Sequence, residues 1–475
     1  MMRSPAIALL PLLALSACTA GPNYRRPPAP LPPAWQAART APAPLPAERA
    51  WWHDLGDPAL DALVARALVG NPDLGQALAR VDQARARAGL VRAGQLPAGE
   101  VSGTLARTRQ SLEAGLGQIS RYVPSFDRMA DAAQLGASAR WEIDLAGGQR
   151  REREAALAGL AGAEAGTGAA RLMVAGAVAD SYIRLRVAER RLALLEERQQ
   201  LVAERRAIMQ ARLREGEAGQ AALDELDAAS AGIAAAVPVL RSARDSLRNR
   251  VTILVGLPVG TDLPELHQAE RFGLVGEGLV SALPEAPLAA APAELLRRRP
   301  DLRVAESRAV AANAGIGQAL AEFWPKLSLS ALAGFDTTRI GTFGGDRSSV
   351  LTGALGLRWR ILDFGRVQAQ VAAARGSARE ALEAWRGAVL QAGADVEDGF
   401  TLLAARRREA TARADGLRAS RSSFVQAGAM AREGEISRDA LAERQLALLV
   451  AEDEAVAARG EAWLALIGAY RAIGG

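Results

Sequence analysis

The feature that most restricts the fold of this 475-residue chain is an internal repeat. Pro72 and Pro300 open similar segments 228 positions apart, and Trp141 and Trp359 begin a second matching pair 218 positions apart. The second offset holds again for an Arg-Glu-Gly-Glu sequence that begins at Arg214 and recurs in the second half. Matching anchors on two offsets predict two copies of one structural unit, the first with a longer loop between Pro97 and Trp141.

Each copy predicts a short helix, two β-strands and a pair of long helices. In segment 134–145, apolar residues such as Leu135 and Ile143 alternate with polar and charged ones. One apolar and one charged face are typical of a membrane β-strand, with lipid on one side and water on the other. Strands are predicted at about 98–108, 133–145, 326–336 and 350–362.

The charged faces of these strands supply the candidate pore-lining residues. A sheet that packs on helices can also alternate, but three charges on one face of the second strand favour a water-filled lumen. The candidates are Arg140, Glu142, Asp144, Arg358 and Arg360.

Four strands in one chain cannot close a membrane barrel. An open edge in hydrocarbon leaves backbone groups without hydrogen bonds, and the smallest natural barrels have about eight strands. Several subunits must therefore pool their strands, so the sequence predicts an oligomer.

The remaining segments predict a mainly α-helical protein. Long helices are expected at 148–214, 221–255, 366–432 and 439–470, with a kink at Pro238 in the second. About 65 residues at ~1.5 Å each correspond to a rod near 100 Å long. Alanine-rich stretches allow such rods to pack closely as coiled coils. The expected fold class is thus mainly α-helical, with long coiled-coil rods, able to cross much of a periplasm, joined to a membrane β-barrel portion.

The N-terminus predicts export and lipid attachment. Arg3 precedes a short apolar run that ends at Leu15-Ser16-Ala17-Cys18, and Cys18 is the only cysteine of the chain. Small residues before a cysteine resemble a bacterial lipobox, in which the thiol carries a diacylglyceryl group. Thr19 rather than an acidic residue follows, a pattern that resembles outer-membrane sorting. The alternative is a chance cysteine after a signal sequence.

The predicted organisation has five parts. A signal peptide (1–17) precedes a proline-rich, lipidated N-terminal strap (18–56). The first repeat (57–260) should begin with Asp57 as helix cap and Pro58 in the first turn. A Gly/Pro-rich segment (261–292) separates it from the second repeat (293–475).

Charge and chemistry exclude several other functions. The 58 basic residues barely exceed the 53 acidic ones, and the two signs interleave at helical spacing, as in segment 150–154, which indicates solvated helix faces rather than a nucleic-acid site. Two histidines in linkers, no nucleophile motif and no phosphate loop argue against an enzyme. No metal site and no cofactor beyond the lipid on Cys18 are expected. A poreless coiled-coil scaffold is the other alternative, which the charged strand faces disfavour.

In combination, these motifs resemble the TolC-type outer-membrane factors, in particular the lipoprotein branch that serves resistance-nodulation-division efflux pumps. The resemblance extends over nearly the whole mature chain and rests on five segments: 18–27, Trp51-Trp52, 295–302, 311–317 and 362–366. It implies a homotrimer with a twelve-stranded barrel, embedded in outer-membrane lipid, over a twelve-helix tunnel. A periplasmic adaptor and an inner-membrane transporter would be its partners. Small molecules are the expected cargo, with protein secretion or metal efflux as the alternatives.

The resemblance also places a periplasmic gate beyond the turn at 434–438. Asp439 and Glu443, four positions apart, would form the acidic ring, although an aspartate is more usual at the second position. The alternative is an ordinary acidic helix start, with Asp439 as the cap. Asp224, Glu225 and Asp227 near the tip of the first repeat are expected to contact the adaptor or neighbouring helices.

Overall fold

The fold is taken from a computed structural model of the chain. It describes residues 19–36, 50–113, 118–123, 125, 127–268, 272–274, 277–278, 283 and 292–475, so Cys18 and the signal peptide lie outside the described residues. The chain divides into two compact units. The strand unit comprises Met1–Pro27, Asp82–Gly162 and Ala305–Ala384. The helical unit comprises Pro28–Val81, Ala163–Val304 and Trp385–Gly475.

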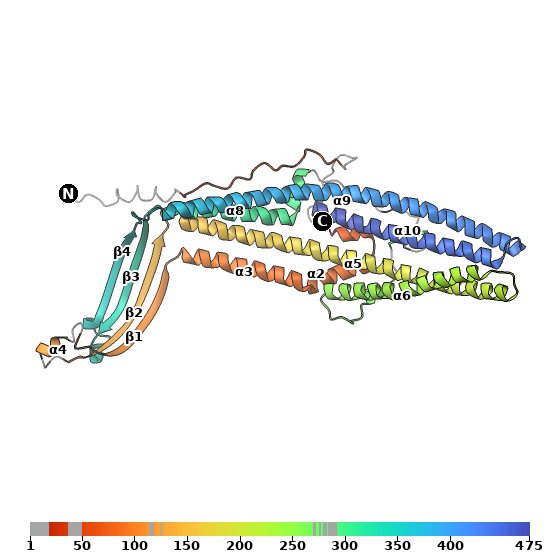
Figure 1. Cartoon of the computed structure of the whole chain (residues 1–475). Helices are drawn as coiled ribbons and strands as arrows, with labels where there is room; N and C mark the ends of the chain where they lie inside the picture. Colours follow the sequence, from red (N-terminus) through yellow and green to blue (C-terminus); the bar gives the residue numbers. More distant parts are fainter. Residues whose placement is uncertain are drawn as a thin grey trace. The chain divides into compact units, whose positions relative to one another are not determined.

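The strand unit contains one four-stranded antiparallel sheet (Figure 1). Its strands lie in chain order: β1 (Ala98–Arg109), β2 (Met129–Ile143), β3 (Lys326–Thr337) and β4 (Ser349–Arg358). Ala98 is opposite Arg140 in the first hairpin, and Lys326 is opposite Arg358 in the second. Adding the offset of 228 to Ala98 gives Lys326, and adding the offset of 218 to Arg140 gives Arg358. The two repeats therefore share one hairpin register. The two-repeat fold is thereby confirmed.

The register also gives the sheet two different faces. Leu135 lies opposite Phe335, and Leu329 lies opposite both Trp141 and Leu355, which extends an apolar face across three strands. The intervening positions carry most of the serines and charged residues, whereas Arg107, Arg109 and Asp131, near the far ends of β1 and β2, lie on the same side as the apolar residues. Because directly opposite residues of antiparallel strands share a face, every strand contributes its odd-numbered residues to the apolar side.

Two tryptophans related by the repeat fix the ends of the strands to the segment that precedes each hairpin in the same chain. The indole Nε1–H of Trp141 donates to the carbonyl of Gln95 at 2.9 Å, and that of Trp359 donates to the carbonyl of Phe323 at 3.0 Å. Both acceptors belong to the link between a short helix and a strand. These helices are α3 (Pro72–Gly94) and α8 (Pro300–Ala321).

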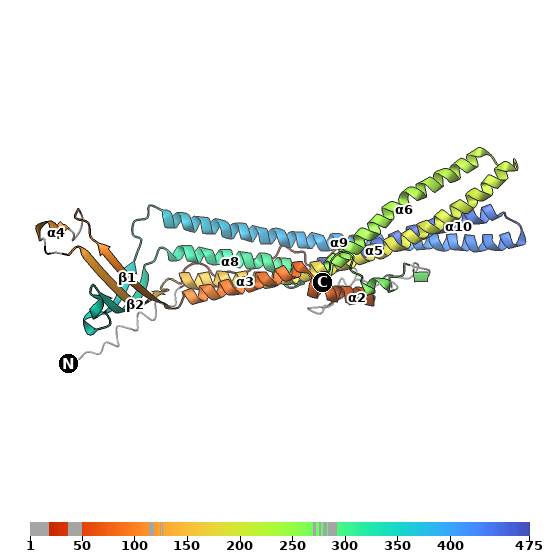
Figure 2. The same cartoon turned by 90° about the horizontal axis from the view of Figure 1, so that it is seen from below.

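The helical unit is built on two hairpins of long helices (Figure 2). The first joins α5 (Gly148–Arg214) to α6 (Gln220–Leu254), which contains Pro238, and the second joins α9 (Arg366–Glu433) to α10 (Arg438–Ile473). A cluster that includes Leu194, Leu417 and Leu449 packs α5 against α9 and α10. Leucine and valine side chains therefore join the two repeats as well as the helices within each.

Shorter helices lie before and between the strands and the long helices. Helix α2 (Pro58–Gly70) begins as expected, since the Asp57 carboxylate accepts the N–H groups of Ala59 and Leu60 at 2.8 and 3.1 Å. The others are η3 (Trp51–Leu55), α4 (Ile119–Tyr122), η5 (Pro264–His267), η7 (Pro292–Glu294), α7 (Leu295–Arg298), η8 (Ile340–Thr342) and η9 (Asp346–Ser348). Among the described residues, no helix combines the length and apolar character needed to cross a bilayer.

Candidate functional site

Three of the five pore-lining candidates share one face of the sheet. Arg140 lies opposite Ser330, Glu142 opposite Ser328, and Arg358 opposite Lys326, and all of these positions are on the polar side. Arg140 and Arg358 are exposed and have no carboxylate partner within the described ranges. Both guanidinium groups are therefore open to solvent in the single subunit.

The other two candidates lie just beyond the strands. An Asp144 carboxylate oxygen accepts the backbone N–H of Arg150 at 2.9 Å, at the start of α5. The guanidinium of Arg360 is 3.2 Å from the Glu322 carboxylate, which also pairs with Lys326 at 2.5 Å. Charged groups thus continue from the polar face of the sheet to the base of the strands.

The gate candidates lie in the first turns of α10, directly after the turn that joins α9 to α10. Gly434 has a φ of 80°, a conformation that glycine adopts without strain, and it ends α9. The Ser437 hydroxyl accepts the N–H of Ala440 at 3.2 Å and so caps α10. Because Ser437 supplies the cap, the Asp439 carboxylate is available for another contact.

That contact is with the first repeat. The Asp439 carboxylate accepts two hydrogen bonds from Arg205 of α5, at 2.8 and 3.2 Å. This hydrogen-bonded pairing is the main cause that raises the pKa of Arg205, and the nearby charge of Glu443 adds to it. Glu443 is exposed on α10. The two gate candidates therefore differ: Asp439 is held by an arginine, and Glu443 is open to solvent.

Two more ion pairs join α5 to α10. Arg190 contacts Glu452 at 2.6 Å, and Arg191 donates to Asp453 at 2.8 and 3.1 Å. From the sequence, such charges were interpreted as solvated helix faces, and their carboxylate partners on α10 were not predicted. A signal was present: Arg191 and Arg205 are 14 residues apart, as are Asp439 and Asp453, which is two heptads on antiparallel helices.

The interpretation of segment 150–154 as a solvated helix face is wrong for Arg151, which is buried. Its side chain is 4% exposed, because its guanidinium donates to the strap: to the carbonyls of Ala20 and Gly21 at 3.0 and 2.9 Å, and to Asn23 Oδ1 at 2.8 Å. Glu154 provides a fourth acceptor at 2.6 Å. The backbone carbonyls of the strap replace the water that was expected around this arginine.

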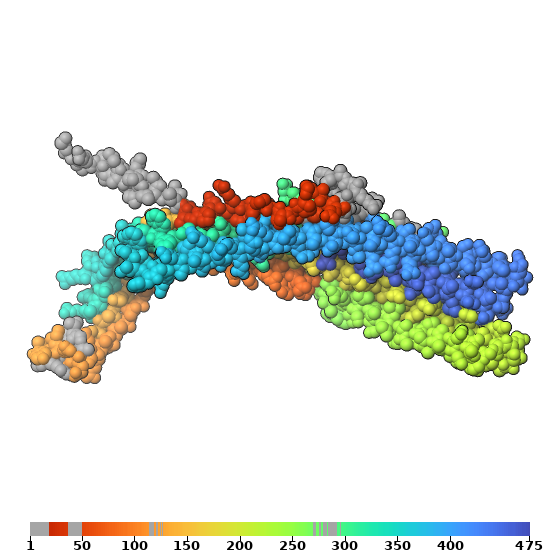
Figure 3. Space-filling view, turned by 45° about the horizontal axis from the view of Figure 1, so that its top comes forward, coloured from red at the N-terminus to blue at the C-terminus, as the bar shows by residue number. Residues whose placement is uncertain are grey.

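Further contacts hold strap residues 19–27 within the strand unit (Figure 3). Asn313 of α8 donates to the carbonyl of Pro22 at 2.9 Å, and Arg26 forms two hydrogen bonds of 2.5 Å with Glu306. Burial and the Glu306 charge raise the pKa of Tyr24. The strap is thus bonded to α5 and to α8 from its first described residues onward.

This geometry agrees with comparisons to known proteins. A family model described as outer membrane efflux protein matches residues 63–257 and 291–475. The chain belongs to the outer membrane efflux protein family. It is similar to two proteins of Pseudomonas aeruginosa. One is the pyoverdine export outer membrane protein OpmQ, with 30% identity over 90% of this chain and 87% of OpmQ. The other is outer membrane protein OprJ, with 29% identity over 100% and 97%.

A solved structure extends the agreement to three dimensions. The outer-membrane channel OprN superimposes with a TM-score of 0.80 and 28% identity, over 96% of this chain and 99% of OprN. The outer membrane efflux protein described here is therefore a TolC-type channel subunit, the exit duct of an efflux pump.

Proposed function

We propose that three copies of this chain close a twelve-stranded barrel in the outer membrane. The observation that supports this assembly is the sheet itself. Within the described residues, β1 and β4 each pair along one edge only, so both outer edges need a partner. β4 of one subunit beside β1 of the next satisfies both edges, and three such contacts close the ring.

In this assembly the polar face of the sheet lines the channel and the apolar face meets lipid. Arg140, Glu142 and Arg358 then line the water-filled lumen, with Asp144 and Arg360 at its periplasmic end. The duct conducts passively and carries out no catalysis. A periplasmic adaptor and an inner-membrane resistance-nodulation-division transporter deliver the cargo to the helical tip. Small molecules are the cargo favoured by the relatives, since OpmQ is described as a pyoverdine exporter.

Asp439 and Glu443 form the periplasmic gate. Three copies of each bring six carboxylates to the tip, and rings of like charge attract cations and repel anions. The ion pair between Arg205 and Asp439 holds α10 against α5 in the closed state. Opening requires this contact to break, and adaptor binding can supply the free energy only through a higher affinity for the open state.

Cys18 carries the lipid that anchors each subunit to the inner leaflet of the outer membrane. Each buried methylene of an acyl chain contributes roughly 0.8 kcal/mol. Cys18→Ala should abolish the acyl mass, while a barrel that is already inserted stays in the membrane. Intact mass spectrometry of the purified protein measures this, and an unacylated N-terminus at another residue contradicts the anchor.

Recording in planar bilayers tests the duct. Purified protein should migrate as a trimer that dissociates on heating. In the bilayer it should give single-channel currents that are selective for cations. The Asp439→Ala, Glu443→Ala double variant should lose part of that selectivity. A monomer without conductance would refute the duct, and unchanged selectivity in the double variant would refute the gate alone.

A further inference from the structure

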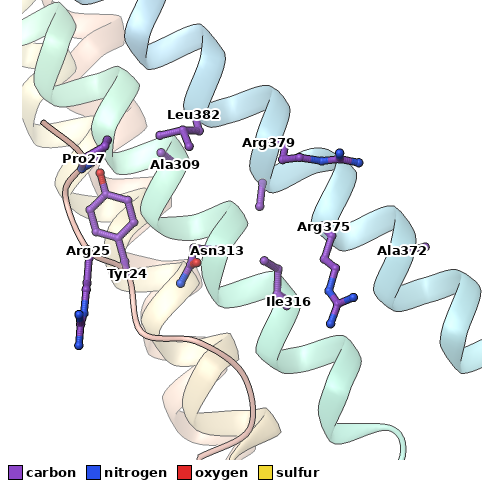
Figure 4. A pocket seen from close by; sticks show the side chains of 11 residues that line it. Tyr24, Arg25, Pro27, Ala309, Asn313, Ile316, Ala372, Arg375, Arg379 and Leu382 are labelled. Carbon is purple, nitrogen blue, oxygen red and sulfur yellow. The ribbon is translucent and has the colours of Figure 1, made fainter. Parts of the chain in front are cut away.

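A cavity of about 590 Å³ lies within the strand unit, between the strap, α8 and α9 (Figure 4). Its size is within the range of small-molecule sites in proteins, roughly 300–1,000 Å³. The lining residues from the strap are Tyr24, Arg25 and Pro27; those from the helices are Ala309, Asn313, Ile316, Ala372, Arg375, Ala378, Arg379 and Leu382.

The lining combines an apolar floor with positive charge. Ala309 and Ile316 of α8 are buried, and Figure 4 shows Arg375 of α9 across from Ile316. Arg25 and Arg379 extend at the two sides of the opening. No carboxylate lines the cavity, so its charged side chains are all arginines.

These three arginines differ from their neighbours in having no acidic partner. Arg26 pairs with Glu306, and Arg151 pairs with Glu154. Arg25, Arg375 and Arg379 make no ion pair or side-chain hydrogen bond within the part of the chain that the structure describes. Three guanidinium groups that are not neutralised around an apolar floor are complementary to an anion that carries a hydrocarbon chain.

The cavity also lies near the membrane end of the strand unit. Ile316 is five residues before the end of α8, and Ala372 is six residues after the start of α9. At about 1.5 Å per residue, Ile316 and Ala372 lie within roughly 9 Å of the helix ends that lead to the strands, and Arg375 and Arg379 lie roughly 14 and 20 Å from the start of α9. Tyr24 is six residues after Cys18, which carries the lipid in the proposed function.

We propose that this cavity binds an anionic phospholipid of the leaflet that faces the periplasm. Arg375 and Arg379 are one helical turn apart on α9, so both can reach one phosphate group. Ile316 on α8 lies closer to the strands than either arginine and covers the first part of an acyl chain. The bound lipid then joins the strap to both helices. This site rests on the outer-membrane location in the proposed function.

Native mass spectrometry of the intact trimer tests the site. The protein is released from detergent after addition of phosphatidylglycerol, phosphatidylcholine or inorganic phosphate. Phosphatidylglycerol should stay bound, phosphatidylcholine should bind about tenfold more weakly, and inorganic phosphate alone should be lost. Equal retention of the two lipids would overturn the proposal, and retention of phosphate without lipid would reassign the cavity to a free anion.

Variants separate the cavity from general surface charge. Arg375→Gln with Arg379→Gln should weaken phosphatidylglycerol binding about tenfold. Ala372→Phe should weaken it as well, since the ring fills the cavity while both arginines remain. Arg444→Gln on α10, an exposed arginine outside the strand unit, is the matched control and should bind as wild type.

The remaining outcomes are equally decisive. If the double variant keeps its lipid, or if Arg444→Gln loses as much, the cavity is not the site. If the double variant instead dissociates the trimer, these arginines contact a second subunit and the proposal is wrong. Binding does not require conduction, so a trimer that binds lipid but carries no current would refute the duct and leave the lipid site in place.

Discussion

The guanidinium group of Arg151 lies where the N-terminal strap meets α5. It reaches three acceptors between Ala20 and Asn23 and is almost completely buried. Removal of the group leaves those acceptors without a donor, and hydrogen bonds to charged groups contribute about 1.5–3 kcal/mol each. Arg151→Met should therefore release the strap, seen as faster amide hydrogen exchange at residues 19–26.

Arg153→Met is the control, because Arg153 is an exposed arginine of the same helix and makes no hydrogen bond or ion pair with strap residues 19–27. Exchange that remains slow in Arg151→Met would show that Asn313 and Arg26 are sufficient to hold the segment.

Two glycines related by the repeat offer a paired test of the same contact. A Cβ at Gly317 of α8 would lie 2.6 Å from the Ala20 carbonyl oxygen, whereas at Gly89 of α3 no atom lies within 4 Å. Gly89→Ala should stabilise its exposed helix by about 0.5–1 kcal/mol. Gly317→Ala should displace the strap despite the same gain in helix propensity.

Chemical denaturation and hydrogen exchange measure the two effects. If both alanines stabilise the protein equally, the strap is not packed against Gly317.

Tyr182 of α5 makes stability depend on pH in a defined window. Burial raises its pKa to about 12 from the usual 10, and Asp57 contributes to the shift. The neutral phenol is favoured in the folded state, so this contribution is complete below pH 10 and is lost as pH rises towards 12. The loss amounts to at most about 1.4 kcal/mol per pH unit.

Tyr182→Phe removes this titration. The difference in unfolding free energy between wild type and variant should be constant up to pH 10 and should then shift in favour of the variant. Parallel curves up to pH 12 would contradict the burial of an ionisable group here.

Among whole elements, the long helices were the most predictable. Helix α5 covers the expected 148–214, and α9 extends the expected 366–432 by one residue. Helix-forming residues without interior proline, bounded by glycine turns, define such elements locally. The offsets between the repeats also imply that the two hairpins share one register, although the register itself is known only from the structure.

The contacts of single charges were not predictable in the same way. Arg151 and Arg205 bond to groups more than 100 residues away. Nothing in the local sequence distinguishes Arg151 from a solvated arginine, and Arg205 is marked only by its two-heptad spacing from Arg191. The partner depends on which helices pack together and at what height. The assignments of Asp439, Glu443 and the five pore-lining residues to their functions stay predictions for the same reason, since they need the assembled trimer.

Adjacent positions of β4 test which face of the sheet meets lipid. Leu355 lies opposite Leu329 on the apolar face, and Ala354 lies opposite Ser330 on the polar face. Leu355→Arg should impair assembly at a cost of about 2–4 kcal/mol near the bilayer midplane, whereas Ala354→Arg should be tolerated. The yield of heat-modifiable trimer in outer-membrane fractions measures both, and equal yields would refute the assignment of the faces.

In the proposed gate of the whole channel, closure depends on contacts between the two repeats at the periplasmic tip. The ion pairs of α5 with α10 lie along one antiparallel seam, and only Arg205–Asp439 is next to the α9–α10 turn. Splaying of the tip must separate this pair first, whereas Arg191 and Asp453 lie two heptads farther along the helices. The same kind of ion pair should therefore affect gating differently according to its position.

Arg205→Ala should raise the open fraction of the channel and its cation selectivity, because the three Asp439 carboxylates are no longer neutralised. A partly buried pair worth about 1 kcal/mol corresponds to roughly a fivefold change in the open-to-closed ratio of each subunit's tip. Arg191→Ala is the matched control: it removes a pair of nearly the same geometry, 2.8 and 3.1 Å, away from the tip. Single-channel recording of both variants beside the wild type separates gating from helix packing. If both variants open equally, or if neither differs from wild type, the Arg205–Asp439 contact does not hold the duct closed.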